Sequence, residues 1–326
     1  MISVAICTYN GEKYINEQIT SILNQTITPD EIVLCDDNSK DNTVKIAEKL
    51  LKNSGIKYKI HINKLNKGVT ENFKKAISLC HNNIIFTSDQ DDVWYPNKVE
   101  EIMKEFNKNK NLVLVFTNAE LVDKNLNNMN YKLWDVINFK TSQLESKSYY
   151  DILLNRCIVT GATMAFKKEL IQKIPDFSEN WLHDGWIAIN APLYGDVKAL
   201  DKSLIKYRQH ENNVIGASKK SLLNKVKFWI KKINLIEDIR ITKYSRYEDV
   251  YKLNNKILDE NLKSQLRSCV YFWDDMIKLK YSNKLEGLNI ILKNIKNNNY
   301  HTYYTGYIGA IRDIIYLLIR RKIKVD

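Results

Sequence analysis

The sequence has 326 residues, with 50 Lys and Arg against 38 Asp and Glu and a formal net charge of +12 at pH 7. Its 44% hydrophobic content, with only 10 Gly and 4 Pro, excludes collagen-like, low-complexity and wholly disordered chains. The length suits one large domain or two ordinary ones. Five cysteines without a paired CxxC spacing indicate a reducing compartment, so we expect a cytoplasmic protein.

The chain shows no pattern typical of a targeting or membrane-spanning segment. The first residues, Met1 to Asn10, lack a basic region and a cleavable apolar stretch, and they predict a buried strand rather than a signal peptide. The most apolar run, Tyr307 to Ile319, contains Arg312 and Asp313 and is shorter than the ~18 to 20 residues that a spanning helix needs. We therefore expect no membrane span.

The positive charge is concentrated in the last third of the chain. Up to Gly216 there are 27 basic and 27 acidic residues, whereas residues 217–326 hold 23 basic and 11 acidic ones. This asymmetry predicts an appended basic region that meets an anionic partner or surface. A solvated basic face is the alternative, and no nucleic-acid-binding signature accompanies the charge, so we expect no nucleic-acid partner.

Short β-rich runs alternate with amphipathic helical patterns along the first 90 residues. The predicted strands cover residues 2–7, 31–37, 58–62 and 83–88. Helices are predicted between them, with apolar faces that begin at Ile15, Val44 and Phe73. This alternation predicts an α/β domain with a mostly parallel sheet, helices on both faces and ligands at the carboxyl ends of the strands.

The second half of the sequence divides into two parts. Residues 112–117 and 158–166 predict two more strands, and the polar segment 124–148 between them predicts a loop over the site. From Ser218 onward the pattern predicts an all-α region of about five helices, including an apolar stripe through Ile308, Ile311, Ile315 and Leu318.

Polar and acidic residues follow three of the predicted strands. They are Thr8 to Glu12, Asp36 to Ser39, and Asp89 to Asp92. An Asp-X-Asp pair at a strand end is typical of a Mg²⁺ or Mn²⁺ site that a substrate diphosphate completes. An Asx turn with a helix N-cap is the alternative for Asp36 and Asp37, and a solvated acidic loop is the alternative for Asp89 to Asp92. Neither a dinucleotide-binding glycine fingerprint nor a P-loop is present.

These motifs, taken in order, resemble a known family. The matching segments are Thr8-Tyr9-Asn10-Gly11, Gln25-Thr26, Asp36-Asp37-Asn38-Ser39-Lys40-Asp41, Asn66-Lys67-Gly68 with Asn72, Asp89-Gln90-Asp91-Asp92-Val93-Trp94 with Pro96 and Lys98, His183-Asp184-Gly185-Trp186, and Tyr207 to Asn213. Together they resemble family 2 glycosyltransferases, which are inverting nucleotide-sugar enzymes of the GT-A fold. The Asp-Gln-Asp-Asp-Val-Trp form and the Tyr-Arg-Gln-His segment look most like the bacterial rhamnosyltransferase-like branch.

The resemblance implies a role for each matching residue. Nucleotide-sugar binding would fall to Thr8, Tyr9, Glu12, Asp36, Lys67, Asn72, Asp89 and Gln90. Asp36 would accept the N3 hydrogen of uracil or thymine. Asp89, Asp91 and His210 would hold Mn²⁺ or Mg²⁺. Acceptor contacts would come from Trp181, His183 and Trp186, although core packing of the two tryptophans and an exposed loop position for His210 are the alternatives.

Asp184 falls where the family places its catalytic base. An inverting transfer needs a carboxylate that takes the proton of the acceptor hydroxyl while its oxygen attacks the anomeric carbon. Two departures from the family pattern concern the nucleotide side: Asn38 stands where a Gly is usual, and the common Arg before Asn72 is replaced by Glu71. Asn tolerates a left-handed backbone, so the turn at Asn38 is expected to survive.

The sequence therefore predicts a GT-A nucleotide-sugar-binding and catalytic domain over residues 1–216 and a basic helical region over 217–326. The expected reaction moves a sugar, rhamnose from dTDP-rhamnose being one candidate, to a saccharide or polyprenyl-diphosphate-linked acceptor in surface polysaccharide synthesis. A UDP-sugar donor and a catalytically silent scaffold subunit are the alternatives. The amphipathic pattern over 219–236 and the basic end of the last helix indicate peripheral contact with the inner face of the cell membrane, and a core-packing or oligomer-forming helix is the alternative.

Overall fold

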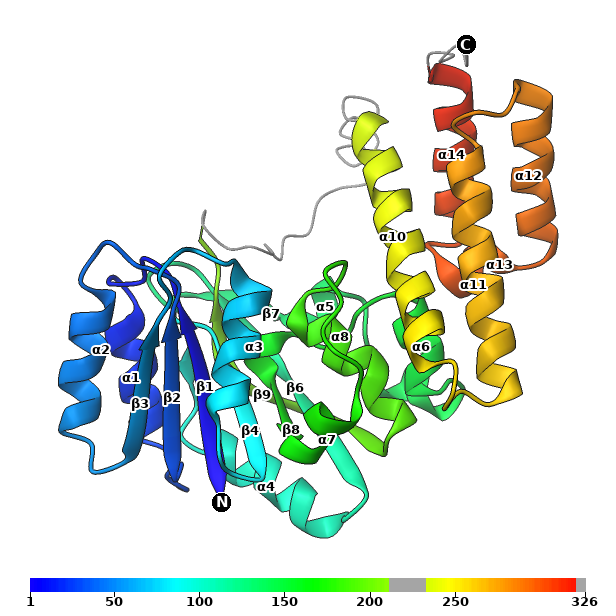
Figure 1. The fold of residues 1–326 in the computed structure, drawn as a ribbon. Coiled ribbons are helices and arrows are strands. Elements are labelled where there is room, and N and C mark those ends of the chain that lie inside the picture. The colour runs from blue at the N-terminus through cyan, green and yellow to red at the C-terminus, as the bar shows by residue number, and fades with distance from the viewer. Residues whose placement is uncertain (211–232, 321–326) are drawn as a thin grey trace. The chain divides into compact units, whose positions relative to one another are not determined.

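The structure, a computed structural model, describes residues 1–210 and 233–320 (Figure 1). It divides into two compact units. The first unit contains residues 1–149, 158–177 and 181–218, and the second contains residues 150–157, 178–180 and 219–326. Two short segments from the first 216 residues therefore belong to the second, helical unit.

The first unit is built on one mixed sheet. Its strands are β1 (Ile2–Thr8), β2 (Glu31–Asp36), β3 (Lys57–Ile62), β4 (Ile84–Ser88), β5 (Val93–Trp94), β6 (Leu112–Val122), β7 (Asn128–Lys132), β8 (Met164–Lys167) and β9 (Asp196–Arg208). They follow the order β3-β2-β1-β4-β8-β6-β9-β5, and β7 pairs with β6. Strands β3, β2, β1 and β4 are parallel, β6 is parallel to β9, and the pairs of β8 are antiparallel.

Strand register brings the ends of β1, β2 and β4 to one edge of the sheet. Thr8 at the end of β1 lies beside Asp36 at the end of β2, and Ile6 lies beside Ser88 at the end of β4. All three strands are buried along their whole length, as continuous apolar runs in a parallel sheet predict. The polar residues that follow them must therefore gather at this edge.

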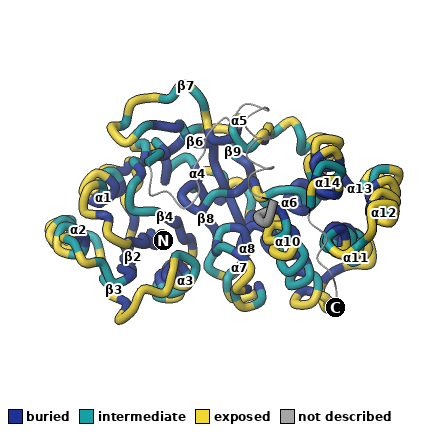
Figure 2. Tube along the Cα trace, turned by 90° about the horizontal axis from the view of Figure 1, so that it is seen from above, coloured by how far each residue is buried: buried dark blue, intermediate teal, exposed yellow. Residues whose placement is uncertain are grey.

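Helices cover both faces of the sheet. They are α1 (Ile15–Leu23), α2 (Thr43–Lys52), α3 (Val69–Leu79), α4 (Lys98–Lys108), α5 (Leu133–Val136), α7 (Lys168–Lys173) and α8 (His183–Asn190). Seen from above, α1 and α4 lie on one face and α3 and α8 on the other, with buried sides turned to the sheet (Figure 2). The predicted α/β architecture is confirmed.

Three parts of the first unit differ from the sequence prediction. Of the predicted strand 158–166, only the part from Met164 onward is extended in a ladder, because residues 161–163 form a 3₁₀ turn. The predicted loop 124–148 contains β7, α5 and a second 3₁₀ turn over 141–145. The long strand β9 was not predicted, since its alternation of polar and apolar residues is irregular and several of its residues are exposed.

The helical unit contains most of α6 (Tyr149–Asn155) and five helices of the described tail. These are α10 (Ile233–Asn254), α11 (Glu260–Lys278), α12 (Lys284–Lys296), α13 (Asn299–Tyr303) and α14 (Tyr307–Ile319). A buried ion pair joins Arg240 of α10 to Asp313 of α14, with Nη2 and Oδ1 2.9 Å apart. Tyr300 donates to the other oxygen of Asp313 at 3.0 Å. Because both charges are paired inside the unit, α14 is turned with its polar side inward.

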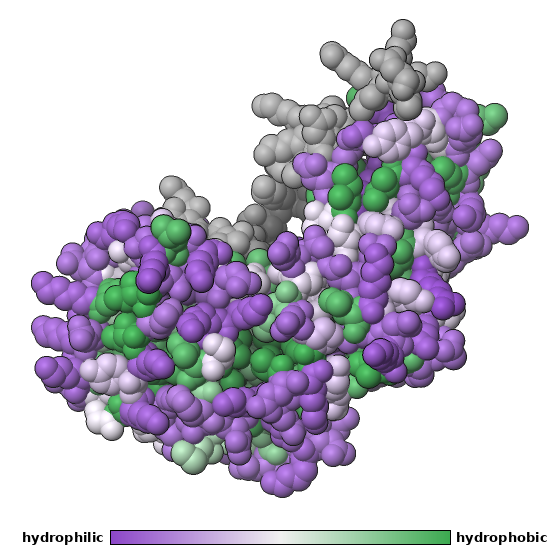
Figure 3. Space-filling model, viewed as in Figure 1, coloured by the Kyte–Doolittle hydropathy of each residue, from purple (hydrophilic) through white to green (hydrophobic). Residues whose placement is uncertain are grey.

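Three of the four residues of the predicted apolar stripe on α14 are exposed, and the fourth, Ile315, is partly buried. Ile308, Ile311 and Leu318 are 48, 57 and 60% exposed, whereas Arg312 and Asp313 are buried. Figure 3 shows hydrophobic and hydrophilic side chains side by side on the surface of this unit. No helix within residues 1–210 and 233–320 is both long and apolar enough to cross a membrane. Most of the predicted helix 219–236 and the basic end after Arg320 lie outside the described residues.

Candidate functional site

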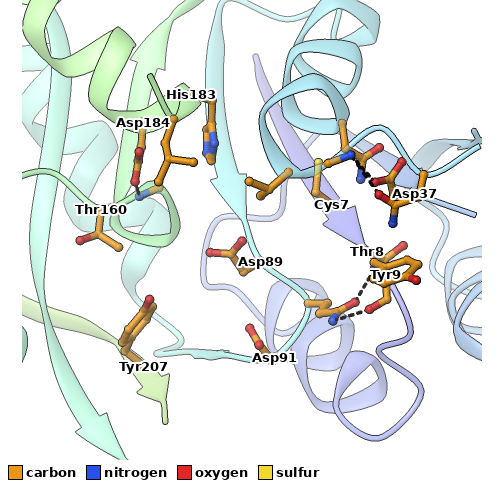
Figure 4. Close-up of a pocket in the computed structure, with 17 residues that line it drawn as sticks. Cys7, Thr8, Tyr9, Asp37, Asp89, Asp91, Thr160, His183, Asp184 and Tyr207 are labelled. Atoms are coloured by element: carbon orange, nitrogen blue, oxygen red, sulfur yellow. Dashed lines mark hydrogen bonds between the residues drawn. The ribbon is translucent and has the colours of Figure 1, made fainter. Parts of the chain in front are cut away.

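A cavity of about 400 Å³ opens at the sheet edge where β1, β2 and β4 end (Figure 4). The predicted site residues that line it are Thr8, Tyr9, Asn72, Asp89, Gln90, Asp91, His183 and Asp184. The predicted site residues that do not line it are Glu12, Asp36, Lys67, Trp181, Trp186 and His210. The structure thus brings together the catalytic candidate and most of the predicted nucleotide ligands.

The carboxylate at the end of β2 that faces the cavity belongs to Asp37, not to Asp36. Asp36 is fully buried, and its oxygens accept hydrogen bonds from the Thr8 hydroxyl at 2.7 Å and from the Ser39 backbone N–H at 2.7 Å. The intervening Asn38 takes a positive φ of 67°, as predicted for the residue that replaces the usual Gly. Of these two carboxylates, Asp36 is therefore enclosed and Asp37 lines the cavity.

Asp37 is held rigidly from the opposite side. Its Oδ1 accepts hydrogen bonds from the Lys67 backbone N–H and from the side chain of Asn63, both at 2.8 Å. The backbone N–H of Gly68 donates to Oδ2 at 2.9 Å. Asn63 also donates to Asn72, which lines the cavity. Lys67 therefore contributes its main chain to this wall, and sequence reasoning could not separate that role from a side-chain contact.

The side chains of Gln90 and Glu12 each form hydrogen bonds with the backbone of a neighbouring loop. The Tyr9 backbone N–H donates to Gln90 Oε1 at 2.8 Å, and Gln90 Nε2 donates to the Tyr9 carbonyl at 3.0 Å (Figure 4). This paired bond joins the loop after β1 to the loop after β4. Glu12 accepts from the Asn42 backbone N–H at 3.0 Å, just before α2, so it stabilises the start of that helix rather than the cavity wall.

The acidic loop after β4 places carboxylates with different surroundings close together. Burial, with the neighbouring charges of Asp91 and Asp184, raises the pKa of Asp89 to about 7. Burial also raises the pKa of Asp92, which accepts the Arg208 backbone N–H at 3.0 Å. Asp92 is 1% exposed, whereas Asp89 lines the cavity and is partly exposed.

Lys98 supplies a buried cation behind the loop. Its side chain is 0% exposed, and its Nζ lies 3.9 Å from the centre of the Trp94 ring. Nζ donates a 2.7 Å hydrogen bond to the carbonyl of Ala162, in the 3₁₀ turn that borders the cavity. Lys98 thus links the loop after β4 to the turn before β8.

His210 lies beside the acidic loop although it does not line the cavity. Its Nε2 is 2.9 Å from Asp91 Oδ2, and its ring stacks on Tyr14 at 5.1 Å between centres. The guanidinium of Arg208 lies 4.5 Å from the same Tyr14 ring and donates through Nε to the Asp91 carbonyl. The alternative of an exposed loop histidine is not supported, because the His210 side chain is only 11% exposed.

Asp184 lies in the first turn of α8, and the backbone N–H groups of Gly161 and Gly185 orient its carboxylate. The Gly161 N–H donates to Oδ2 at 3.0 Å, and the N–H of Gly185 donates to Oδ1 at 2.6 Å. Gly161 is held in turn by its carbonyl, which accepts from the Thr87 hydroxyl at 2.6 Å. A carboxylate in the first turn of a helix is favoured by the helix dipole. These contacts hold the Asp184 carboxylate at the cavity wall.

The two tryptophans flanking Asp184 pack in the interior. Trp186 is 0% exposed and donates to the Pro175 carbonyl at 3.1 Å. Trp181 is 8% exposed, with its ring 6.1 Å from that of Trp186. His183 alone of the three predicted acceptor residues reaches the cavity wall.

The carboxylates fit a divalent cation that shares its shell with a ligand. Within the described ranges, no group of three or more His, Cys, Asp and Glu side chains forms a complete metal site. However, Mg²⁺ is usually held by one or two carboxylates together with substrate phosphates. Asp89 and Asp91 supply that pair on one cavity wall, and the repulsion that raises the pKa of Asp89 is the kind that a cation relieves.

Nine residues of the cavity wall were not among the predicted site residues. They include Asp37, Thr160, Gly161 and Tyr207. Asp37 and Tyr207 stand in recognisable motifs, so a signal was present but pointed to their neighbours. Thr160 and Gly161 carry no local signal, since their place beside Asp184 depends on the long-range contact between the 3₁₀ turn and α8.

A family model and two relatives of known activity match this chain, and all three are glycosyltransferases. The model of glycosyl transferase family 2 matches residues 3–174. The dTDP-rhamnosyl transferase RfbG of Shigella flexneri is 31% identical over 270 residues, covering 78% of this chain and 86% of the relative. The Escherichia coli protein WfgD, a UDP-Glc:alpha-D-GlcNAc-diphosphoundecaprenol beta-1,3-glucosyltransferase, is 27% identical over 226 residues, covering 68% and 82%.

A solved structure shares the fold. The crystal structure of S. aureus TarS 1-349 in complex with UDP-GlcNAc superposes with a TM-score of 0.59 and covers 97% of this chain and 89% of that one. The two sequences are 16% identical, so the likeness concerns the fold.

Proposed function

Because the chain belongs to glycosyl transferase family 2 and has its GT-A fold, we propose that it is an inverting transferase that uses a pyrimidine nucleoside diphosphate sugar. The chain is a glycosyltransferase of glycan synthesis. One observation carries the finer proposal: Asp37, the Asp89–Asp91 pair and Asp184 line one cavity in that order along its wall (Figure 4).

The nucleotide occupies the end of the cavity formed by β1 and β2. The base lies between Tyr9 and the segment from Asn66 to Asn72, where the Asp37 carboxylate accepts the N3 hydrogen of uracil or thymine. Cytosine has no proton at N3 and would leave that carboxylate without a donor. Thr8 supports this wall through its hydrogen bond to Asp36.

A divalent cation, Mn²⁺ or Mg²⁺, would be held by Asp91 and Asp89, with His210 as a further ligand. When bound, it neutralises charge on the leaving diphosphate. Asp92 and Arg208 hold the loop in place behind these ligands, since Asp92 accepts the Arg208 N–H.

Asp184 acts as the general base. Gly161 and Gly185 fix its orientation, so that it meets the acceptor hydroxyl on the side opposite the leaving group. The carboxylate removes the hydroxyl proton while the oxygen attacks the anomeric carbon, and the bond to the nucleoside diphosphate breaks. No covalent enzyme intermediate is needed, and the configuration at the anomeric carbon inverts.

The activities of the relatives support two finer assignments, one for the donor and one for the acceptor. RfbG is a dTDP-rhamnosyl transferase, which favours dTDP-rhamnose as donor, while WfgD and the TarS complex favour a UDP-sugar. Thymine and uracil differ by one methyl group, and Asp37 recognises an edge that both bases share. The diphosphoundecaprenol acceptor of WfgD supports a lipid-linked saccharide as acceptor and a surface polysaccharide as product.

Contact with a membrane surface suits such an acceptor. The tail carries 23 basic and 11 acidic residues after Gly216. Its helix α14 presents Ile308, Ile311 and Leu318 on the outside. Apolar side chains beside basic ones are the combination that an anionic lipid surface attracts.

The test is Asp184→Asn together with a donor panel. The variant should bind donor as the wild type does and lose transfer by about 10²- to 10⁴-fold, because it lacks the base but keeps the cavity. The panel compares UDP-, dTDP- and GDP-sugars with Mn²⁺, Mg²⁺ or EDTA, measured by thermal shift and by release of nucleoside diphosphate.

Two results would contradict the proposal. Equal loss of donor binding and transfer in Asp184→Asn would show that Asp184 maintains the structure rather than the reaction. A wild-type protein that neither binds nor turns over any pyrimidine sugar would exclude the assigned donor class. The preparation of Asp184→Asn serves as its own folding control when its melting temperature without ligand matches that of the wild type.

A further inference from the structure

His183 presents two buried polar atoms for which the described residues supply no hydrogen-bond partner. The residue is 5% exposed, and neither Nδ1 nor Nε2 is satisfied. Buried side-chain nitrogens are nearly always paired, because a buried donor or acceptor without a partner destabilises the protein. The two unpaired nitrogens of His183 therefore indicate that a polar group of a ligand binds beside this ring.

The position of this ring is fixed by its neighbours. It stacks on Phe73 of α3, with ring centres 3.8 Å apart and planes inclined by 16°. On another side it meets Gly161, where an added Cβ would lie 2.8 Å from Nε2. The absence of a side chain at residue 161 thus lets the ring approach the cavity wall.

The ring lies at the transfer end of the cavity. His183 and Asp184 both line it, and Figure 4 shows the ring between Asp184 and Cys7 with Asp89 facing it. Burial lowers the pKa of His183, which favours a neutral imidazole with one donor and one acceptor nitrogen. A sugar hydroxyl can donate to the acceptor nitrogen of such a ring or accept from its donor nitrogen.

We propose that His183 recognises a sugar hydroxyl next to the bond that is made or broken. The proposal rests on the function proposed above and deepens it by naming a specificity-determining residue of the same site. The hydroxyl belongs either to the transferred sugar or to the acceptor saccharide. In both cases a substrate that lacks it leaves the imidazole unpaired, and a site built around a hydroxyl discriminates strongly against such a substrate.

The test is a double-mutant cycle between His183→Phe and single-deoxy substrates. Phenylalanine keeps the stacking on Phe73 and removes both nitrogens. In the wild type, removal of the recognised hydroxyl should lower kcat/KM by about 10- to 100-fold. His183→Phe should show a similar loss with the complete substrate and no further loss with that one deoxy analogue.

Two arms distinguish the source of the hydroxyl. If it belongs to the donor, His183→Phe weakens binding of the UDP- or dTDP-sugar found for the wild type, while binding of free UDP or dTDP is unchanged. If it belongs to the acceptor, donor binding and donor hydrolysis are unchanged, and the KM for a simple saccharide acceptor rises. Either result supports the proposal.

Gly161→Ala and His81→Phe complete the experiment. The added methyl group of Gly161→Ala must displace the ring, so it should reproduce the loss selectively for the same hydroxyl. His81 is an exposed histidine that contacts Glu31 at the opposite edge of the sheet, and His81→Phe should leave every coupling as in the wild type. Melting temperatures show whether each variant is folded.

Additive losses for every deoxy donor and every deoxy acceptor would overturn the proposal. So would His183→Phe kinetics equal to those of the wild type. Both results require an active wild-type protein, so they differ from failure of the proposed function, in which the wild type itself shows no turnover with pyrimidine sugars.

Discussion

At the scale of single residues, the adjacent carboxylates of Asp36 and Asp37 have different surroundings. Asp36 ends β2 with its side chain turned into the loop, where Thr8 and Ser39 donate to it. Asp37 follows with its side chain at the cavity wall, braced by the Gly68 N–H. Successive side chains of an extended strand point to opposite sides, so only one of the two can face the ligand.

This difference predicts that Asp→Asn substitutions at the two positions affect different properties, nucleotide binding at Asp37 and stability at Asp36. Asp37→Asn should weaken binding of UDP or dTDP by about 10-fold, because an amide cannot replace both the acceptor for N3 and the acceptor for Gly68. Asp36→Asn should lower the free energy of unfolding by about 1 to 3 kcal/mol, since the Thr8 hydroxyl and the N–H and hydroxyl of Ser39 lose a carboxylate acceptor. Isothermal titration and urea unfolding measure the two effects. Equal loss of affinity in both variants would contradict the assignment of Asp37.

At the scale of elements, the sheet has a functional edge and a structural edge. At the edge opposite the cavity, Glu31 begins β2 and accepts hydrogen bonds from the Ser3 hydroxyl of β1 and the His81 N–H that follows α3. Burial opposes ionisation of Glu31, but these donors prevail and hold its pKa below the ordinary value of 4.5. The Glu31 carboxylate thus links β1 and β2 to the residue that follows α3.

The lowered pKa predicts how stability depends on pH. Stability contributed by ionised Glu31 is present above pH 4.5 and is lost as the pH falls through the lower pKa of the folded protein. Glu31→Gln should therefore cost about 1 to 3 kcal/mol at pH 7, and the difference from the wild type should shrink toward pH 3. Urea unfolding at several pH values checks this. Glu105→Gln, in an exposed pair with Lys108, is the control, and a difference independent of pH would refute the expectation.

At the scale of the whole molecule, the helical unit is built with an apolar outer face. Its buried Arg240–Asp313 pair holds the polar side of α14 inward, so Ile308, Ile311 and Leu318 remain outside. The stripe is therefore not part of the core of the described unit. Core packing, one of the alternatives for the last helix, does not apply to these three side chains within residues 233–320.

The outer face and the basic charge predict salt-sensitive attachment to anionic lipid. The wild-type protein should sediment with phosphatidylglycerol vesicles and not with phosphatidylcholine vesicles, and binding should fall as salt rises through ~0.1 to 1 M. Ile311→Glu should weaken binding further, while Leu253→Glu, at an exposed position on α10, is the matched control. Salt-independent binding would exclude the electrostatic model. A dimer that Ile311→Glu dissociates, without vesicle binding, would favour the oligomer.

The sequence by itself determined the alternation of strands and helices over about the first 90 residues and the acidic groups that follow these strands. Both depend on local patterns, because apolar periodicity selects the element and parallel strands bring their carboxyl ends to one edge. The positions of Asp89, Asp91 and Asp184 at one cavity follow from this topology and the family motifs, and the structure agrees.

Only the tertiary structure decided which neighbouring side chain faces the cavity. The choice of Asp37 over Asp36, the burial of Trp186 and the contact of Gly161 with Asp184 and His183 depend on packing between segments far apart in the sequence. The outward stripe of α14 has the same origin. Periodicity shows that a helix has an apolar side, but the partner of Asp313 on another helix determines which side is turned inward.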